Sequence, residues 1–159
     1  MPTPPFVLAL RARVGHDPLW LPGTTAVVLR EDGPRPRLLL VRRSDTGEWT
    51  PVTGIVDPGE DPAVAAVREV LEEADVVAVA ERLAQVSVVG PVQYDNGDVS
   101  QYLDVTFRCR WVSGEPFPAD GENTDARWFD LDDLPAMSPG MASRVAAALP
   151  ARGEAEFRA

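Results

Sequence analysis

The segment 54–76, GIVDPGEDPAVAAVREVLEEADV, constrains this chain more than any other part of its sequence. On a helix, Glu69, Glu72 and Glu73 stand at positions i, i+3 and i+4, so three carboxylates share one face. Like charges this close repel each other. In a metal site that repulsion is relieved by a hard divalent cation such as Mg²⁺, which is held through oxygen ligands. The alternative is a solvated acidic helix face.

The same segment also carries signals for where its helix begins and which side it buries. Asp61 is a favourable N-cap and Pro62 suits the first helical position, so the helix is expected to start there. Apolar residues at helical spacing form the expected core-facing stripe: Ala63, Val67, Val70, Leu71 and Ala74. The carboxylates fall largely off this stripe, which predicts a helix with one buried side and one acidic side. A solvated acidic helix would show the same stripe, so the stripe alone does not distinguish a metal site from a solvated acidic face.

Three more residues stand at fixed distances from the carboxylates. Gly54 is followed by Glu60 after five residues, and Arg68 follows after seven more. With residue frequencies of roughly 6–7% each, six specified positions coincide by chance in about one window in ten million. A chain of 159 residues offers far fewer windows than that, so accident does not explain the pattern.

This pattern resembles the Nudix box, G-x5-E-x7-R-E-U-x-E-E-x-G-U, in which U is a bulky aliphatic residue. The matching residues are Gly54, Glu60, Arg68, Glu69, Val70, Glu72, Glu73 and Val76. The second glycine of the box is replaced by Asp75. The family glycine is expected to end the helix in a left-handed conformation, which Asp tolerates at a cost of roughly 1 kcal/mol. The alternative is that the helix ends differently. This departure bears on how the helix ends more than on metal binding. The flanks are also similar to MutT-like Nudix proteins, so the resemblance covers about residues 20–136.

The resemblance implies a role for most residues of the box. The matching glutamates of Nudix enzymes bind Mg²⁺ or Mn²⁺, and one of them takes a proton from water. Glu69, Glu72 and Glu73 are therefore the expected metal ligands and catalytic groups. The carbonyl of Thr53 is a further candidate ligand. Arg68 is expected to orient a box glutamate and so to assist catalysis.

The remaining box residues have expected structural roles. Gly54 and Gly59 are expected to allow a tight loop with unusual backbone dihedral angles. Glu60 is expected to act structurally or as an outer contact of the metal.

Residues outside the box that could bind substrate carry weaker signals. Arg42 and Arg43 precede the loop and are candidates for contacting phosphate, although a solvated pair at a strand end is an equal alternative. Tyr94 stands near the position where diadenosine polyphosphate hydrolases carry a tyrosine. Nudix proteins often place an acidic residue near Glu122 and Asp125 as a ligand, base or substrate contact.

The resemblance implies a Mg²⁺-dependent pyrophosphohydrolase. It would cleave a nucleoside diphosphate linked to another moiety, as in ADP-ribose, or a nucleoside triphosphate, by attack of water on phosphorus. One alternative is a domain that senses a nucleotide without cleaving it. An enzyme like isopentenyl-diphosphate isomerase is disfavoured, because its catalytic cysteine would fall at Thr53. The sequence SQPWPxPxS, a signature of NADH pyrophosphatases, is absent.

The charge balance and the single cysteine limit the expected partners and location. The formal net charge of −10 argues against non-specific binding to nucleic acid, which needs a basic surface. No apolar run approaches the ~18–20 residues that cross a membrane, and residues 1–15 lack the basic start of a signal peptide. Cys109 lies in an apolar alternation and is expected to be buried. We therefore expect a cytoplasmic protein without nucleic-acid or membrane partners. Dimers are common in the family, which allows a homodimer.

Apolar runs separated by turn residues predict one α+β domain that spans residues 1–159, with a mixed sheet between helices. The stretch EDGPRP joins two runs into an expected hairpin, and Asn96-Gly97 joins another pair. The resemblance makes this fold more specific, because it implies the Nudix α/β/α sandwich. The expected strands span residues 6–14, 24–30, 37–42, 83–94, 99–111 and 127–129, and the expected loop spans 49–59. The expected C-terminal helix spans about 141–149, and the last residues after it are expected to fray.

Overall fold

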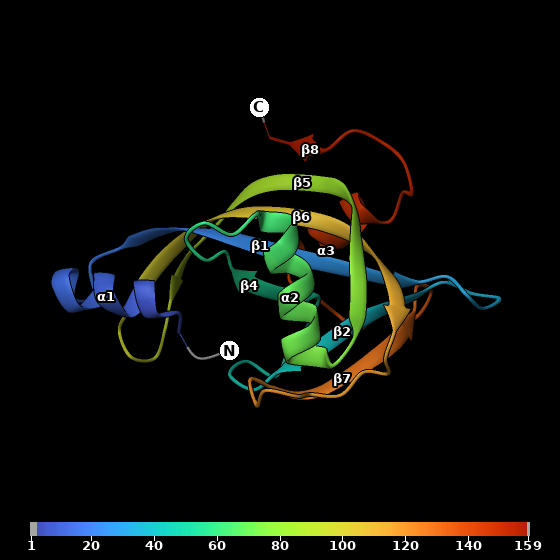
Figure 1. Cartoon of the computed structure of the whole chain (residues 1–159), viewed down its shortest axis with the longest axis horizontal. Helices are drawn as coiled ribbons and strands as arrows, with labels where there is room; N and C mark the ends of the chain where they lie inside the picture. The colour runs from blue at the N-terminus through green and yellow to red at the C-terminus, as the bar shows by residue number, and fades with distance from the viewer. Residues whose placement is uncertain (1–2, 159) are drawn as a thin grey trace.

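A long mixed sheet with a helix on each face forms the centre of the computed structural model, which describes residues 3–158 (Figure 1). In chain order the elements are α1 (Pro5–Val14), β1 (Leu19–Arg30), β2 (Arg37–Arg43), β3 (Trp49–Thr50), β4 (Val52–Ile55), α2 (Pro62–Ala74), β5 (Val77–Gln93), β6 (Val99–Ser113), β7 (Asn123–Asp130), α3 (Pro139–Ala148) and β8 (Glu156–Phe157). This architecture confirms the expected α+β class and the mixed sheet between helices.

The strands follow the order β3-β2-β1-β6-β5-β8, while β4 pairs with β1 and β7 pairs with β2. β1 runs parallel to β6, and the β5–β6 hairpin is antiparallel. The middle of β1, residues 23–26, pairs with β4, and its last two residues pair with β2. This change of partner along β1 separates β4 from β2, and a pocket opens beside β4.

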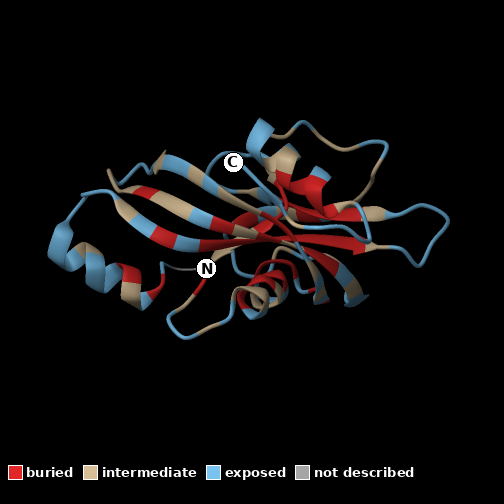
Figure 2. Cartoon of the chain, turned by 90° about the horizontal axis from the view of Figure 1, so that it is seen from above, coloured by how far each residue is buried: buried red, intermediate tan, exposed pale blue. Residues whose placement is uncertain are grey.

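The two faces of the sheet are covered by different helices, as Figures 1 and 2 show. Along β1, Ala26 and Val28 point to the α2 side, whereas Val27 and Leu29 point to the α3 side. All four are at most 1% exposed, so this part of β1 reads as a continuous apolar run. Both hairpins predicted from turn residues are present, because β1 pairs with β2 and β5 pairs with β6.

Three expectations about local structure were wrong. Residues 6–14 form part of α1, because Pro5 opens a helix, the following residues are mostly good helix formers, and Gly15 ends it with φ 61°. The expected loop at 49–59 contains β3 and β4, whose backbones pair with β2 and β1. Residues 156–157, expected to fray with the rest of the C-terminus, pair with β5 as β8. Within residues 3–158 no helix is long and apolar enough to cross a membrane.

Candidate active site

The helix α2 buries two of its carboxylates rather than presenting all of them to solvent. Glu69 is 2% exposed and Glu73 is 5% exposed, and both lie on the side that also buries Val70. Leu71, expected in the core-facing stripe, is 49% exposed. The prediction that the acidic side lies off the buried side was therefore wrong for Glu69 and Glu73. Only Glu72 fits it, with a side chain that is 41% exposed.

Gly54 is required for space and not for the unusual backbone dihedral angles that the sequence suggested. A Cβ atom added at this position would overlap the Cγ, Cδ and Oε1 atoms of Glu69. The glycine is required because the Glu69 side chain passes directly over the β4 backbone. Gly59, by contrast, has φ 86° with open space around it, so the expected unusual backbone conformation applies there.

Arg68 joins the middle of α2 to the loop that precedes the helix. Its Nε and Nη2 atoms donate to the two carboxylate oxygens of Glu60 at 2.8 and 2.9 Å. Its Nη1 atom donates to Glu69 at 3.1 Å and to Glu72 at 3.3 Å. The bidentate pair lowers the pKa of Glu60 and raises that of Arg68. This geometry agrees with Arg68 as a residue that orients Glu69, and with a structural role for Glu60.

Burial dominates the electrostatics of the two inner carboxylates. It raises the pKa of Glu69 to about 7, although Arg68 opposes the shift, and it raises the pKa of Glu73 to about 8. Glu73 accepts a hydrogen bond from Asn123 Nδ2 at 2.9 Å, at the start of β7. No sequence motif indicated Asn123, because 50 residues separate it from its partner.

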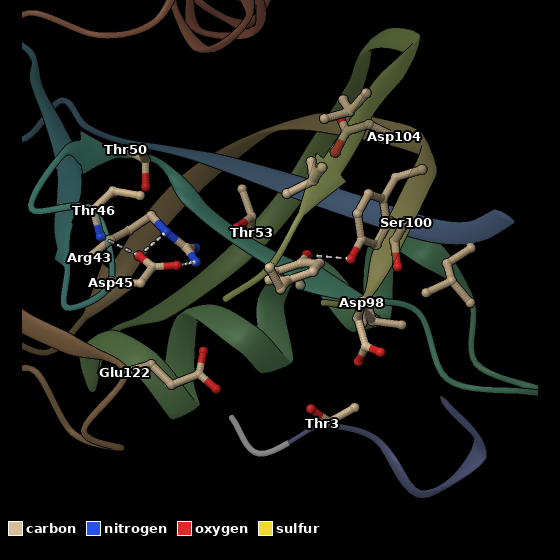
Figure 3. A pocket seen from close by; sticks show the side chains of 18 of the residues that line it. Thr3, Arg43, Asp45, Thr46, Thr50, Thr53, Asp98, Ser100, Asp104 and Glu122 are labelled. Atoms are coloured by element: carbon tan, nitrogen blue, oxygen red, sulfur yellow. Dashed lines mark hydrogen bonds and ion pairs between the residues drawn. The ribbon is translucent and has the colours of Figure 1, made fainter. Parts of the chain in front are cut away.

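A pocket of about 700 Å³ lies beside these carboxylates, between α1, β1, β4 and the ends of β2 and β5 (Figure 3). Of the residues singled out in the sequence, seven line it: Arg43, Thr53, Gly54, Glu69, Glu73, Tyr94 and Glu122. Within residues 3–158, Arg42, Gly59, Glu60, Arg68, Glu72 and Asp125 do not line it. The pocket thus brings together parts of the box, one arginine of β2 and the tyrosine that follows β5.

Because side chains alternate along a strand, only one of the two candidate arginines of β2 lines the pocket. Arg43 lines the pocket and forms a bidentate pair with Asp45 at 2.9 and 2.6 Å, which raises the Arg43 pKa. Arg42, its exposed neighbour, donates instead to the carbonyl of Gly47 at 3.2 Å. The hydroxyl oxygen of Tyr94 lies 2.6 Å from that of Tyr102, and burial raises the Tyr94 pKa.

The region after the box shows a similar division. Asp125 forms an ion pair with Arg127, whereas Glu122 faces the pocket, as Figure 3 shows. Glu122 is therefore the better placed of the two acidic candidates.

The donor set at the pocket suits a hard divalent cation, although the ligands are not gathered into a complete site. Within residues 3–158 no three His, Cys, Asp or Glu side chains are arranged to hold a metal ion. Glu69 and Glu73 nevertheless offer buried carboxylate oxygens, which Mg²⁺ prefers. Thr53 and Glu122 border the same pocket and could supply further oxygens.

Comparison with known proteins agrees with this geometry. Residues 20–149 match the model of the NUDIX domain family. The chain is 33% identical over 129 residues to the NAD-capped RNA hydrolase NudC of Stutzerimonas stutzeri (strain A1501), covering 78% of this chain and 41% of that protein. It is 32% identical over 117 residues to a MutT-like protein of Streptomyces ambofaciens, covering 74% and 68% respectively.

The solved structure of a MutT NUDIX hydrolase from Burkholderia pseudomallei superposes with a TM-score of 0.60 at 27% identity, covering 81% of this chain and 98% of that one. The chain spans about two fifths of the length of the NudC relative. The match of the family model over most of the chain, together with the box and the pocket beside it, shows that this protein belongs to the NUDIX domain family.

Proposed function

We propose that this protein is a Mg²⁺-dependent pyrophosphohydrolase that cleaves a nucleoside diphosphate linked to another moiety, by attack of water on phosphorus. The observation that carries the proposal is the pair of buried carboxylates, Glu69 and Glu73, at the wall of a pocket of about 700 Å³. Buried carboxylates cost free energy unless a cation or hydrogen bonds compensate them. A pair kept in this position therefore fits a cation-binding role better than a purely structural one.

Glu69 and Glu73 would hold the cation, with the Thr53 carbonyl and Glu122 as candidate additional ligands. When bound, the cation would neutralise phosphate charge and make water a better nucleophile. Arg68 fixes the Glu69 carboxylate through the bond at 3.1 Å. Asn123 does the same for Glu73 at 2.9 Å. Glu72 remains a candidate ligand by resemblance, although its half-exposed side chain bonds to Arg68.

Arg43, which also lines the pocket, can supply the positive charge that a diphosphate needs. Its charge interacts with that of Glu73, and Figure 3 shows its guanidinium paired with Asp45. An incoming phosphate would compete with Asp45 for the same donors. The similarity to a hydrolase of NAD-capped RNA and to a MutT-like protein supports a nucleotide-linked substrate. The net charge of −10 favours a small nucleotide over RNA.

A nucleotide-sensing domain that does not cleave its ligand is the second candidate. One observation favours it: of the three glutamates expected to bind metal, only Glu69 and Glu73 line the pocket within the described chain. The two candidates differ in whether any diphosphate is hydrolysed when Mg²⁺ or Mn²⁺ is supplied.

The test is hydrolysis of ADP-ribose, nucleoside triphosphates and dinucleoside polyphosphates by the wild type and by Glu73→Gln. We expect the variant to lose more than about a hundredfold in metal-dependent turnover, because it loses a ligand rather than a neighbour of a ligand. Glu81→Gln is the matched control, since Glu81 pairs with Arg110 outside the pocket. Full activity in Glu73→Gln would refute the assigned site, and nucleotide binding without cleavage by the wild type would favour the sensor.

A further inference from the structure

One buried arginine that the proposed chemistry does not use faces the same pocket from α3. Arg144 is 6% exposed and lines the pocket. Its Nη1 atom donates to Thr25 Oγ1 at 2.9 Å and lies 3.6 Å from Asp104 Oδ1. Burial lowers the pKa of this guanidinium, and Asp104 offsets part of that effect.

Most of the hydrogen-bonding capacity of Arg144 is unused. A guanidinium carries five N–H donors in one plane. Within residues 3–158 its Nε and Nη2 atoms donate no hydrogen bond, and the bond to Thr25 is its only one. Neither atom is a fully buried donor without a partner, so both keep access to solvent at the pocket that Arg144 lines, and a ligand there can supply the acceptors.

The charge around Arg144 indicates what kind of acceptor fits. Asp104 is 4% exposed and carries the opposite charge, and it also accepts hydrogen bonds from Thr25 at 2.7 Å and from Thr106 at 2.7 Å. The pair of Arg144 and Asp104 is therefore close to neutral overall. A neutral acceptor edge is compatible with such a pair, whereas a second phosphate would meet repulsion from the Asp104 carboxylate.

The surroundings of Arg144 suit a flat, partly apolar group. Gly23 has no side chain, and the Tyr102 ring fills the space beside it, 3.4 Å from where a Cβ would stand. Apolar and aromatic side chains that line the pocket include Tyr102, its strand neighbours Leu21 and Val89, and Met141 of α3. Figure 3 shows Asp104 on the far side of the pocket from Arg43 and Asp45. The end of the pocket near Asp104 thus combines polar groups with an aromatic ring, and the other end holds Arg43, the candidate phosphate contact.

We propose that Arg144 determines specificity by donating to two neighbouring acceptors of a planar nucleobase, as on the O6/N7 edge of a 6-oxopurine. This assignment rests on the proposed function, because it places the nucleoside end of the same substrate. Arginine is suited to this pair of acceptors, whereas adenine replaces one of them with an N–H donor. The substrate is therefore a guanine or hypoxanthine nucleotide in preference to an adenine nucleotide.

The test compares guanine and adenine nucleotides in the wild type, Arg144→Gln and Arg82→Gln. Arg82 also holds α3, through bonds to the carbonyls of Ala147 at 2.7 Å and Pro150 at 2.9 Å, but lies outside the pocket. For the wild type we expect kcat/KM to favour GTP over ATP by about tenfold or more. Arg144→Gln should reduce that ratio at least tenfold, because glutamine pairs with adenine. Arg82→Gln should leave the ratio unchanged even if it lowers stability.

Binding of GMP and AMP to the same three proteins in EDTA separates this inference from the proposed function. Tighter binding of GMP that depends on Arg144, without cleavage of any diphosphate, would support the inference and refute the hydrolase. Hydrolysis with a base ratio unchanged in Arg144→Gln would overturn the inference and leave the hydrolase intact. An equal loss for both bases would show that Arg144 is structural, which also overturns it.

Discussion

At the scale of single residues, the position of the Glu69 carboxylate depends on the absence of a Cβ atom at Gly54. Gly54 leaves the space through which the Glu69 side chain reaches the pocket. Arg68 then fixes the carboxylate from one side. Substituting a glycine that is required for the space it leaves should have a different effect from substituting one that is required for its backbone dihedral angles.

Gly54→Ala should therefore impair activity more than it impairs folding. The added Cβ would overlap Glu69 and force its carboxylate to move, at a cost in stability of about 1–3 kcal/mol. We expect a loss of at least about tenfold in turnover, because misplaced catalytic groups lose rate steeply. The measurement is kcat together with urea unfolding.

Gly59→Ala is the matched control for this substitution. Its φ of 86° makes alanine unfavourable by roughly 1 kcal/mol, but open space surrounds the position. Turnover should stay near that of the wild type. Equal losses of turnover in the two variants would show that the loop conformation, and not the space beside Glu69, is what activity requires.

At the scale of elements, the sequence predicted best where local chemistry decides the structure. The start of α2 at Pro62 and the hairpin at Asn96-Gly97 both follow from residues within one turn. The α1 helix was missed because its apolar residues alternate loosely, which obscured the helical start at Pro5. Strands β3 and β4 were missed because they are short and depend on partners distant in the chain.

The candidate site shows the same limit. The box identified Glu69 and Glu73, but helical periodicity counts glutamate as polar and so placed them on the wrong side of α2. Their burial depends on Gly54 and on the pocket, which only the fold assembles. Asn123 and Arg144 come from distant strands and helices, so no local pattern could identify them.

The end of α2 allows a direct test of the departure from the box. Asp75 adopts the left-handed conformation with φ 54° and ψ 32°, as expected for this position, and its N–H donates to the carbonyl of Leu71 at 3.1 Å. Asp75→Gly should stabilise the protein by up to about 1 kcal/mol, because glycine adopts this conformation without strain. Urea unfolding measures the change, and turnover should be unaffected. A loss of stability would mean that the Asp75 side chain makes a favourable contribution of its own.

At the scale of the whole molecule, two buried acids tie stability to pH. In EDTA, the folded state keeps protons on Glu69 up to about pH 7 and on Glu73 up to about pH 8, while the unfolded chain releases them near pH 4.5. Between these values the folded state binds more protons than the unfolded state, so stability falls as pH rises. The expected slope is up to about 1.4 kcal/mol per pH unit for each group.

A divalent cation should reverse this trend, because it binds the deprotonated carboxylates and competes with their protons. We expect MgCl₂ to raise the unfolding temperature over that in EDTA, and to raise it more at pH 8 than at pH 6. Glu73→Gln should flatten the pH dependence in EDTA and remove most of the Mg²⁺ effect, whereas Glu81→Gln should change neither. The measurement is the unfolding temperature of the wild type and the two variants, in MgCl₂ and in EDTA, at pH 6 and at pH 8. If Mg²⁺ stabilised Glu73→Gln as much as the wild type, the cation would bind elsewhere, and the buried pair would have no part in holding it.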